Sequence, residues 1–255
     1  MIGSNSKCML CTLEKPLRKS HILPRSFLRH LKRDTNQLLE VGIYSGKKPR
    51  KINFNPTELM LCNECEQLLD LNYEKYGAIY LRRRKNLSHR KSSLLLNNYV
   101  FETFYLYFIS ILWRASKTSL DFFKNVDISA YEQAMRQCLL ANTHIVNADF
   151  SLEHLIQVRL TRLVSNDIPQ DVFDRMFINF AGHTTDDYHE CSCVMDGYHV
   201  LFFFPFNSRT MKNSLRGTLR RRATLRIPKV NYHLIESVDT ALINAAKLST
   251  QFPII

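Results

Sequence analysis

Cys8-Met-Leu-Cys11 and Cys62-Asn-Glu-Cys65 are two C-x2-C pairs, and 50 residues lie between them. Two thiolates at this spacing can bind one metal ion from a single tight turn, and two such pairs supply the four soft ligands of a closed tetrahedral zinc site. The metal would tie the two pairs together and make one unit of the segment between them. We therefore predict a structural zinc ion here, the alternative being two unrelated pairs of buried thiols.

The length and the cysteine count limit the class of protein. With 255 residues, of which 45% are hydrophobic, the chain can bury a real core in one large or two small domains. The first residues hold no apolar stretch of signal-peptide length, and seven cysteines without such a signal favour a reducing compartment. We therefore expect a cytoplasmic protein. The most apolar segment, Tyr99 to Trp113, is shorter than the roughly 18 residues of a membrane span, so we expect no membrane association.

The formal net charge of +12 is unevenly distributed along the chain. Residues 1–95 hold 19 Lys and Arg against 8 Asp and Glu, a balance of +11, whereas residues 96–255 hold 16 against 15, a balance of +1. This asymmetry favours a polyanionic partner, most often nucleic acid, for the N-terminal half. The densest basic run there consists of Arg82, Arg83, Arg84 and Lys85. We expect this run to contact nucleic acid, the alternative being a solvated linker.

A second basic stretch covers residues 216–222, with Lys212 and Arg226 beside it. Arginine side chains suit phosphate oxygens, so this stretch either extends a nucleic-acid surface or is an ordinary solvated segment. The sequence leaves both interpretations open.

The patterns along the chain predict an α+β protein in two parts. Residues 1–80 form the metal-organised module, with a short helix from Pro24 to Arg33 and a helix around the second cysteine pair that ends at Gly77. Residues 81–255 form a mixed α/β domain with a buried helix near residues 97–120. A β-hairpin is expected near residues 190–206, because Asp196-Gly197 is a strong two-residue turn signal between apolar runs. The polar residues 182–193 are expected to form a loop.

Eight residues of the N-terminal part match the motifs of a known family. They are Cys8, Cys11, His21, Ile22, Pro24, Leu61, Cys62 and Cys65. Over roughly residues 8–75 the sequence resembles the HNH nucleases, whose core is a ββα-metal module. The rest of the chain looks similar to uncharacterised bacterial HNH-like proteins, without a motif that fixes a function.

The resemblance implies a role for His21 and for the residues that match the family's cation site. In the family a histidine at the end of the first strand activates the attacking water, and a divalent cation stabilises the phosphate. The cation positions correspond here to Ser20 and Glu66, and both depart from the common pattern. Glu66 suits Mg²⁺ as a carboxylate, whereas a serine hydroxyl is a poor ligand that could orient a water molecule. His21 could instead be structural, its ring bonded to a backbone carbonyl.

Five further residues near these positions are candidates for the same site. The family's asparagine has no clean match, with Asn53 and Asn55 nearest and Thr57 at the expected spacing. Two carboxylates, Asp70 and Glu74, follow Glu66 at about one and two helical turns.

The sequence therefore predicts a metal-dependent, HNH-like endonuclease that cleaves nucleic acid, with DNA as the expected substrate. Its cofactors would be a structural Zn²⁺ and a catalytic Mg²⁺ or Mn²⁺. Defence against foreign DNA is implied by the resemblance alone. The alternative is an inactive zinc-stabilised module for binding nucleic acid or protein, with the C-terminal part serving a protein partner or a second copy of the chain.

Overall fold

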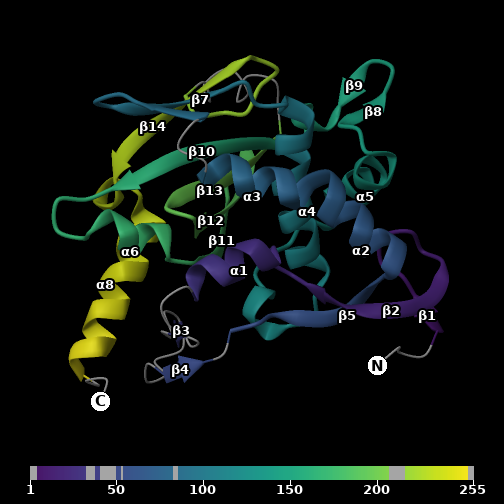
Figure 1. Cartoon of the computed structure of the whole chain (residues 1–255), viewed down its shortest axis with the longest axis horizontal. Helices are drawn as coiled ribbons and strands as arrows, with labels where there is room; N and C mark the ends of the chain where they lie inside the picture. Colours follow the sequence, from purple (N-terminus) through teal and green to yellow (C-terminus); the bar gives the residue numbers. More distant parts are fainter. Residues whose placement is uncertain are drawn as a thin grey trace.

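The computed structural model describes residues 5–32, 38–40, 50–52, 54–82, 86–206 and 216–251. Its N-terminal part is a three-stranded antiparallel sheet in the order β1-β2-β5, followed directly by a helix (Figure 1). The elements of this part are β1 (Asn5–Lys7), β2 (Glu14–His21), α1 (Arg25–Leu31), β3 (Leu38–Glu40), β4 (Arg50–Ile52), β5 (Thr57–Cys62) and α2 (Asn63–Leu69). The fold is mixed α and β, as the sequence predicts.

The short helix expected after Pro24 is present as α1, with Pro24 at its N-terminal boundary. Proline suits the start of a helix because its fixed φ matches the first turn. The helix buries Phe27, Leu28 and Leu31 on one face, and this face belongs to the main hydrophobic core.

The helix that begins at the second cysteine pair is longer than the sequence predicts. After α2 it passes through one π-helical turn, η1 (Asp70–Glu74), and continues as α3 (Lys75–Arg82). The expected end at Gly77 is therefore wrong. A Cβ atom on Gly77 would lie 2.2 Å from Cγ of Tyr107, so the missing side chain lets α3 approach the neighbouring helix closely. Glycine serves packing here and does not end the helix.

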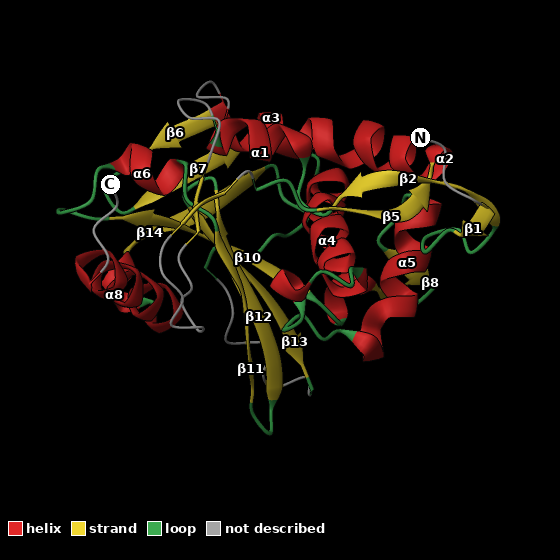
Figure 2. Ribbon diagram, turned by 90° about the horizontal axis from the view of Figure 1, so that it is seen from below, coloured by secondary structure: helices red, strands yellow, loops and turns green. Residues whose placement is uncertain are grey.

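That neighbouring helix, α4 (Phe101–Lys117), lies at the centre of the molecule. Thirteen of its 17 residues are buried, and a helix that is apolar on all sides must be covered on all sides. It packs against α3, η1 and α5 (Glu132–Ala141), and the Tyr105 hydroxyl donates a hydrogen bond to the carbonyl of Ile156 beside the main sheet, at 2.6 Å. In Figure 2, α4 stands between that sheet and the strands β2 and β5.

The main sheet has seven strands in the order β11-β12-β13-β10-β14-β7-β6. All neighbours are antiparallel except β10 and β14, which are parallel. The strands are β6 (Leu87–His89), β7 (Ser93–Asn97), β10 (Gln157–Val164), β11 (Ile178–Thr184), β12 (Tyr188–Met195), β13 (Tyr198–Pro205) and β14 (Thr224–Asn231). Smaller elements are β8 (Ile145–Asn147), β9 (Phe150–Ser151), α6 (Gln170–Asp174) and α8 (Glu236–Gln251).

A hairpin joins β12 and β13 at Asp196 and Gly197, whose φ angles are 51° and 75°. Positive φ at both central residues is the geometry that makes an Asp-Gly pair a hairpin signal. The expectation of a loop at residues 182–193 is wrong, because these residues belong mostly to β11 and β12. The polar residues that suggested a loop occupy a second hairpin at the free edge of the sheet.

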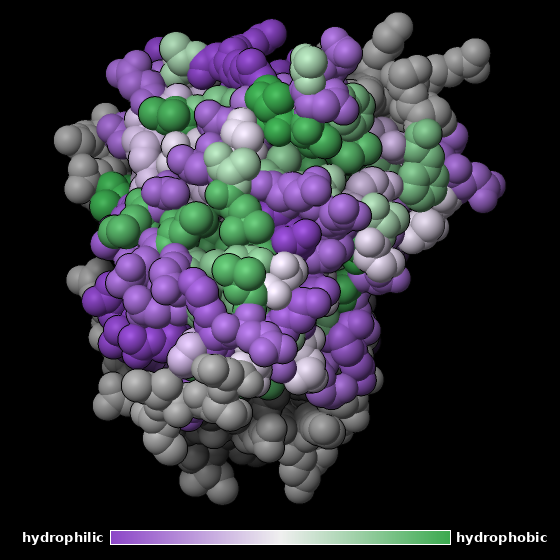
Figure 3. Space-filling model, turned by 90° about the vertical axis from the view of Figure 1, so that its right-hand side faces the viewer, coloured by the Kyte–Doolittle hydropathy of each residue, from purple (hydrophilic) through white to green (hydrophobic). Residues whose placement is uncertain are grey.

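One continuous cluster of buried side chains contains residues from Cys8 to Ile227, and so includes both predicted parts. The division into residues 1–80 and 81–255 stays a prediction about the sequence, since the two parts share this core. On the side nearest α2 and α5, hydrophobic groups are mixed with hydrophilic residues (Figure 3), which is ordinary for a protein surface. No helix in the described part of the chain has the length and apolar character needed to cross a bilayer.

Candidate functional site

The four cysteines of the two C-x2-C pairs converge on one point. Cys8 and Cys11 lie in the turn between β1 and β2, Cys62 ends β5, and Cys65 lies in the first turn of α2. The four sulfur atoms lie within 4.8 Å of one another, and Sγ of Cys11 is 3.9 Å from Sγ of Cys62. Ligands of a tetrahedral zinc ion, each at about 2.3 Å, have a similar spacing. The cluster can therefore hold one metal ion.

The turn that carries the first pair is held by backbone hydrogen bonds. The N–H of Thr12 donates to the carbonyl of Cys8 at 2.8 Å, and the N–H of Cys8 donates to the carbonyl of Leu13 at 2.9 Å. The N–H of Cys62 donates to Sγ of Cys8 at 3.3 Å. A hydrogen bond from the Cys65 thiol, opposed by burial and helped by the backbone amides of Cys62, Cys11 and Leu10, lowers the pKa of Cys8 to about 4. A thiolate is thus favoured at Cys8, whereas burial raises the pKa of Cys62 to about 11 and the hydrogen bond to Cys8 raises the pKa of Cys65.

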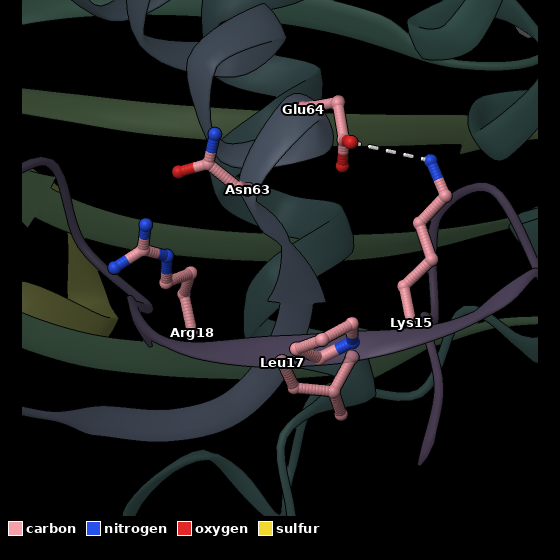
Figure 4. A pocket seen from close by; sticks show the side chains of 6 residues that line it. Lys15, Leu17, Arg18, Asn63 and Glu64 are labelled. Carbon is pink, nitrogen blue, oxygen red and sulfur yellow. Dashed lines mark ion pairs between the residues drawn. The ribbon is translucent and has the colours of Figure 1, made fainter. Parts of the chain in front are cut away.

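A pocket of about 270 Å³ lies next to the second cysteine pair, between β2 and the start of α2 (Figure 4). It is lined by Lys15, Pro16, Leu17, Arg18, Asn63 and Glu64. Lys15 and Glu64 face each other across it with a distance of 3.4 Å between Nζ and Oε1. The predicted catalytic residues are not among its lining, so the pocket does not mark the predicted site.

His21 is the last residue of β2 and pairs with Thr57 at the start of β5. Burial lowers the pKa of its imidazole, and the positive charges of Arg25 and Arg114 act in the same direction. The Glu74 carboxylate and a hydrogen bond with Asn55 act in the opposite direction. The lowered pKa keeps the ring neutral at neutral pH, which is the form that can accept a proton.

Ser20, next to His21, has a structural task that its sequence position does not reveal. The pairing of β2 with β5 shifts by one residue between Arg18 and Lys19, where Met60 is passed over. The fully buried Ser20 hydroxyl accepts a hydrogen bond from the N–H of Leu61 at 3.1 Å. Because a bulge leaves ladder groups unpaired, a side-chain acceptor at this point satisfies one of them.

Glu66, the other residue at a predicted cation position, is partly buried on α2 and hydrogen-bonded to Ser20. Burial raises the pKa of its carboxyl, while the Ser20 hydroxyl and the Arg114 charge partly offset the effect. Its Oε1 atom is buried and has no hydrogen-bond partner among the described residues. A buried carboxylate oxygen with an unused acceptor is unusual and is consistent with a site for water or a cation.

Arg114 of α4 lies between His21 and the carboxylates of this site, and no motif in the sequence marks it as a site residue. Its side chain is 1% exposed. One nitrogen, Nη1, lies 2.6 Å from Oε1 of Glu74 and donates to the carbonyl of His21 at 2.8 Å. Nε donates to the carbonyl of Ser110 at 3.2 Å, and Nη2 is buried with no partner in the part of the chain that the structure describes. The only signal in the sequence is an arginine at the end of a strongly apolar segment.

The structure thus brings His21, Glu66 and Glu74 near one guanidinium group. They do not form a ligand cluster, because the four cysteines are the only group of three or more metal-binding side chains with converging ligand atoms in the described part of the chain. Asp70 forms an ion pair with Lys75, with a distance of 3.2 Å between Oδ2 and Nζ.

Five of the predicted residues cannot be placed. Asn53, Arg83, Arg84 and Lys85 lie outside the described residues, and Arg82 is described only as the last residue of the α3 backbone. The predicted nucleic-acid contact of this basic run therefore stays a prediction.

Comparison of the chain with models of protein families, with curated proteins and with solved structures found no match. The resemblance to HNH nucleases stays a prediction, and the function has to be inferred from the site itself.

Proposed function

We propose that the chain is a zinc-stabilised, metal-dependent endonuclease of the HNH type that cleaves phosphodiester bonds, with DNA as its substrate. One observation carries the proposal. A half-buried histidine with a lowered pKa ends the first of two antiparallel strands that lead into a helix, and the Glu74 carboxylate in the continuation of that helix, η1, lies near it. His21 would remove the proton from the water molecule that attacks the phosphorus atom.

The neighbouring groups supply orientation and charge. Arg114 holds the backbone at His21 by its carbonyl, and a fixed backbone limits where the imidazole can point. Glu66 and Glu74 bring negative charge that a hard divalent cation prefers. When bound there, Mg²⁺ or Mn²⁺ would neutralise charge that develops on the phosphate.

The four-cysteine cluster would hold a structural Zn²⁺, because four sulfur ligands suit zinc and leave no open position for chemistry. Replacing Cys62 by Ser should therefore lower the zinc content and destabilise the N-terminal part, since metal binding and folding are coupled. Zinc content by elemental analysis and the melting temperature measure both effects. Cys138→Ser, at a buried thiol outside the cluster, is the control for the zinc content. Metal-free protein of unchanged stability would contradict the proposal.

Nicking of supercoiled plasmid DNA in the presence of Mg²⁺ or Mn²⁺ tests the catalytic proposal. His21→Ala should lower the rate by about 100-fold or more, as is typical of a lost general base, while the zinc content stays unchanged. The acid limb of the wild-type pH profile should fall below pH 6.5, the ordinary pKa of histidine, since that of His21 is lowered. The matched control is His183→Ala, which removes an exposed histidine of β11. Equal nicking by wild type and His21→Ala would contradict the assignment of His21 as the general base.

A second candidate function is nucleic-acid binding without cleavage. It is favoured by one observation, that His21, Glu66 and Glu74 form no converging ligand set while Arg114 already pairs with Glu74. DNA binding by the wild-type protein, with no nicking under any metal, would support this candidate over the nuclease.

A further inference from the structure

Two segments that are far apart in the sequence form one edge region of the main sheet. Residues 86–99 contain β6 and β7, and residues 216–231 contain β14. Strands β7 and β14 pair antiparallel, with Arg226 opposite Leu95 and Thr224 opposite Asn97. Figure 1 shows β7 and β14 side by side, away from β2 and β5. Charges on the two segments are therefore neighbours in space.

These two segments, which we call the basic edge, contain no acidic residue. Their cations are Arg90, Lys91, Arg216, Arg220, Arg221, Arg222, Arg226 and Lys229. Eight positive charges are thus concentrated in 30 residues of a chain whose formal net charge is +12. The sequence alone shows two separate runs, and the β7–β14 pairing makes one surface of them.

Several of these side chains are held in place on the sheet. Nζ of Lys229 donates to the carbonyl of Arg90 at 2.8 Å, and Nε of Arg226 donates to the hydroxyl of Ser93 at 3.3 Å. Arg90, Arg222 and Arg226 are exposed, and none of them has an acidic partner among the described residues. Within the described ranges, Arg221 is the only one of the eight cations close to a carboxylate, that of Glu153, with Nε 3.9 Å from Oε1. The cations are positioned, and their charge is not neutralised within the described part of the chain.

Like charges on neighbouring strands repel each other, so such a surface costs stability unless an anion binds it. Guanidinium groups with free N–H donors match phosphate oxygens in shape and charge. We propose that the basic edge binds the phosphodiester backbone of nucleic acid. The proposal rests on the proposed function for the choice of nucleic acid as the polyanion.

The basic edge lies at a distance from the candidate catalytic residues. Strand β7 leads into the first turn of α4 at Phe101, whereas Arg114, which contacts His21, lies 13 residues further along the same helix. At 1.5 Å per residue this separation is about 20 Å. It corresponds to about six base pairs at 3.4 Å each. The edge would therefore position a duplex and would not take part in bond cleavage.

Fluorescence anisotropy with a 20-base-pair DNA duplex and an RNA duplex of the same sequence, without added Mg²⁺ or Mn²⁺, tests this inference. In the triple variant R90Q/R222Q/R226Q we expect binding at 0.1 M salt to be weaker by about 100-fold. The slope of log K against log salt should become shallower by about 2 to 3, because three phosphate contacts are lost. Loss with both duplexes identifies the backbone as the contact, and loss with one identifies which nucleic acid is bound.

The control triple variant is K75Q/K124Q/R175Q, which removes the same net charge from two exposed lysines and a half-exposed arginine elsewhere, all with acidic partners. It should bind almost as the wild type does. Equal weakening in both triple variants would overturn the inference, since general charge would then explain binding. Unchanged duplex binding in the edge variant, together with lost binding to vesicles that contain phosphatidylserine, would overturn it in favour of a membrane surface. Because no cleavage is measured, the outcome does not depend on whether the protein is a nuclease.

Discussion

At the scale of single residues, Thr12 occupies a backbone conformation that its side chain disfavours. Its φ is 64°, in the left-handed region, where a β-branched residue is a genuine outlier. The other described non-glycine residues with positive φ are Asn98, Asn142 and Asp196, all of types that tolerate this region. Thr12 directly follows Cys11, so the strain lies in the turn that presents the first cysteine pair. The metal-binding turn imposes this conformation, whatever residue occupies the position.

Thr12→Gly should therefore stabilise the protein. Relief of the left-handed strain should raise the free energy of unfolding by about 1–2 kcal/mol. The greater freedom of glycine in the unfolded chain should lower it by about 0.5–1 kcal/mol. We expect a net gain of about 0.5–1 kcal/mol in the free energy of unfolding of the zinc-loaded protein, measured by urea denaturation. Thr12→Ala is the control, because alanine keeps the Cβ atom that causes the strain. A glycine variant no more stable than the alanine variant would show that the turn is unstrained.

At the scale of elements, several local signals predict the structure correctly, whereas features set by contacts between distant elements are not predicted. The C-x2-C pairs, the proline before α1 and the Asp196-Gly197 turn each act within a few residues, so the sequence reveals them. Gly77 has its reason in Tyr107, 30 residues further along the chain, and no local pattern contains that information. The order of the seven strands is likewise set by packing between segments far apart in the sequence.

Gly77→Ala should destabilise the protein, against the rule that alanine favours a helix. The gain in helix propensity is about 1 kcal/mol, whereas forcing a methyl group into a packed contact costs about 1–3 kcal/mol. The new Cβ would lie 2.2 Å from the Tyr107 ring, so we expect the steric cost to exceed the gain, by about 1 kcal/mol. Chemical denaturation of Gly77→Ala in the wild-type and Tyr107→Leu backgrounds checks the cause. The alanine should be less harmful beside the smaller leucine, and an equal loss in both backgrounds would exclude the ring contact.

At the scale of the whole molecule, Arg114 joins the sheet-bearing part of the chain to the candidate site. It belongs to the central helix α4, yet its guanidinium contacts His21 and Glu74 in the N-terminal part. A buried ion pair adds little net stability compared with apolar groups, but the loss of one partner leaves an unpaired buried charge. The two predicted parts of the chain are therefore coupled through this contact. The sequence could not predict it, because a single arginine in an apolar segment does not identify its partner.

Removal of either Arg114 or Glu74 alone should thus destabilise the protein strongly, and removal of both should destabilise it by less than the sum of the two single losses. Arg114→Met and Glu74→Gln should each lower the free energy of unfolding, by about 3–5 kcal/mol where the remaining charge stays buried. The double variant should lose clearly less than the sum of the two, with a coupling energy of about 1–3 kcal/mol in the double-mutant cycle. Urea denaturation of all four proteins measures this cycle. Strict additivity would mean that the ion pair does not link the two parts in solution.

The same variants connect the fold to the proposed chemistry. The Arg114 charge helps to lower the pKa of His21, so its loss in Arg114→Met should raise that pKa towards 6.5. In the plasmid assay the acid limb of the pH profile should then move to higher pH, because the base is protonated sooner as the pH falls. Arg114→Lys, which keeps the charge, should leave the limb near its wild-type position. If both variants lose activity without any shift of the limb, Arg114 supports the fold only and does not set the protonation of His21.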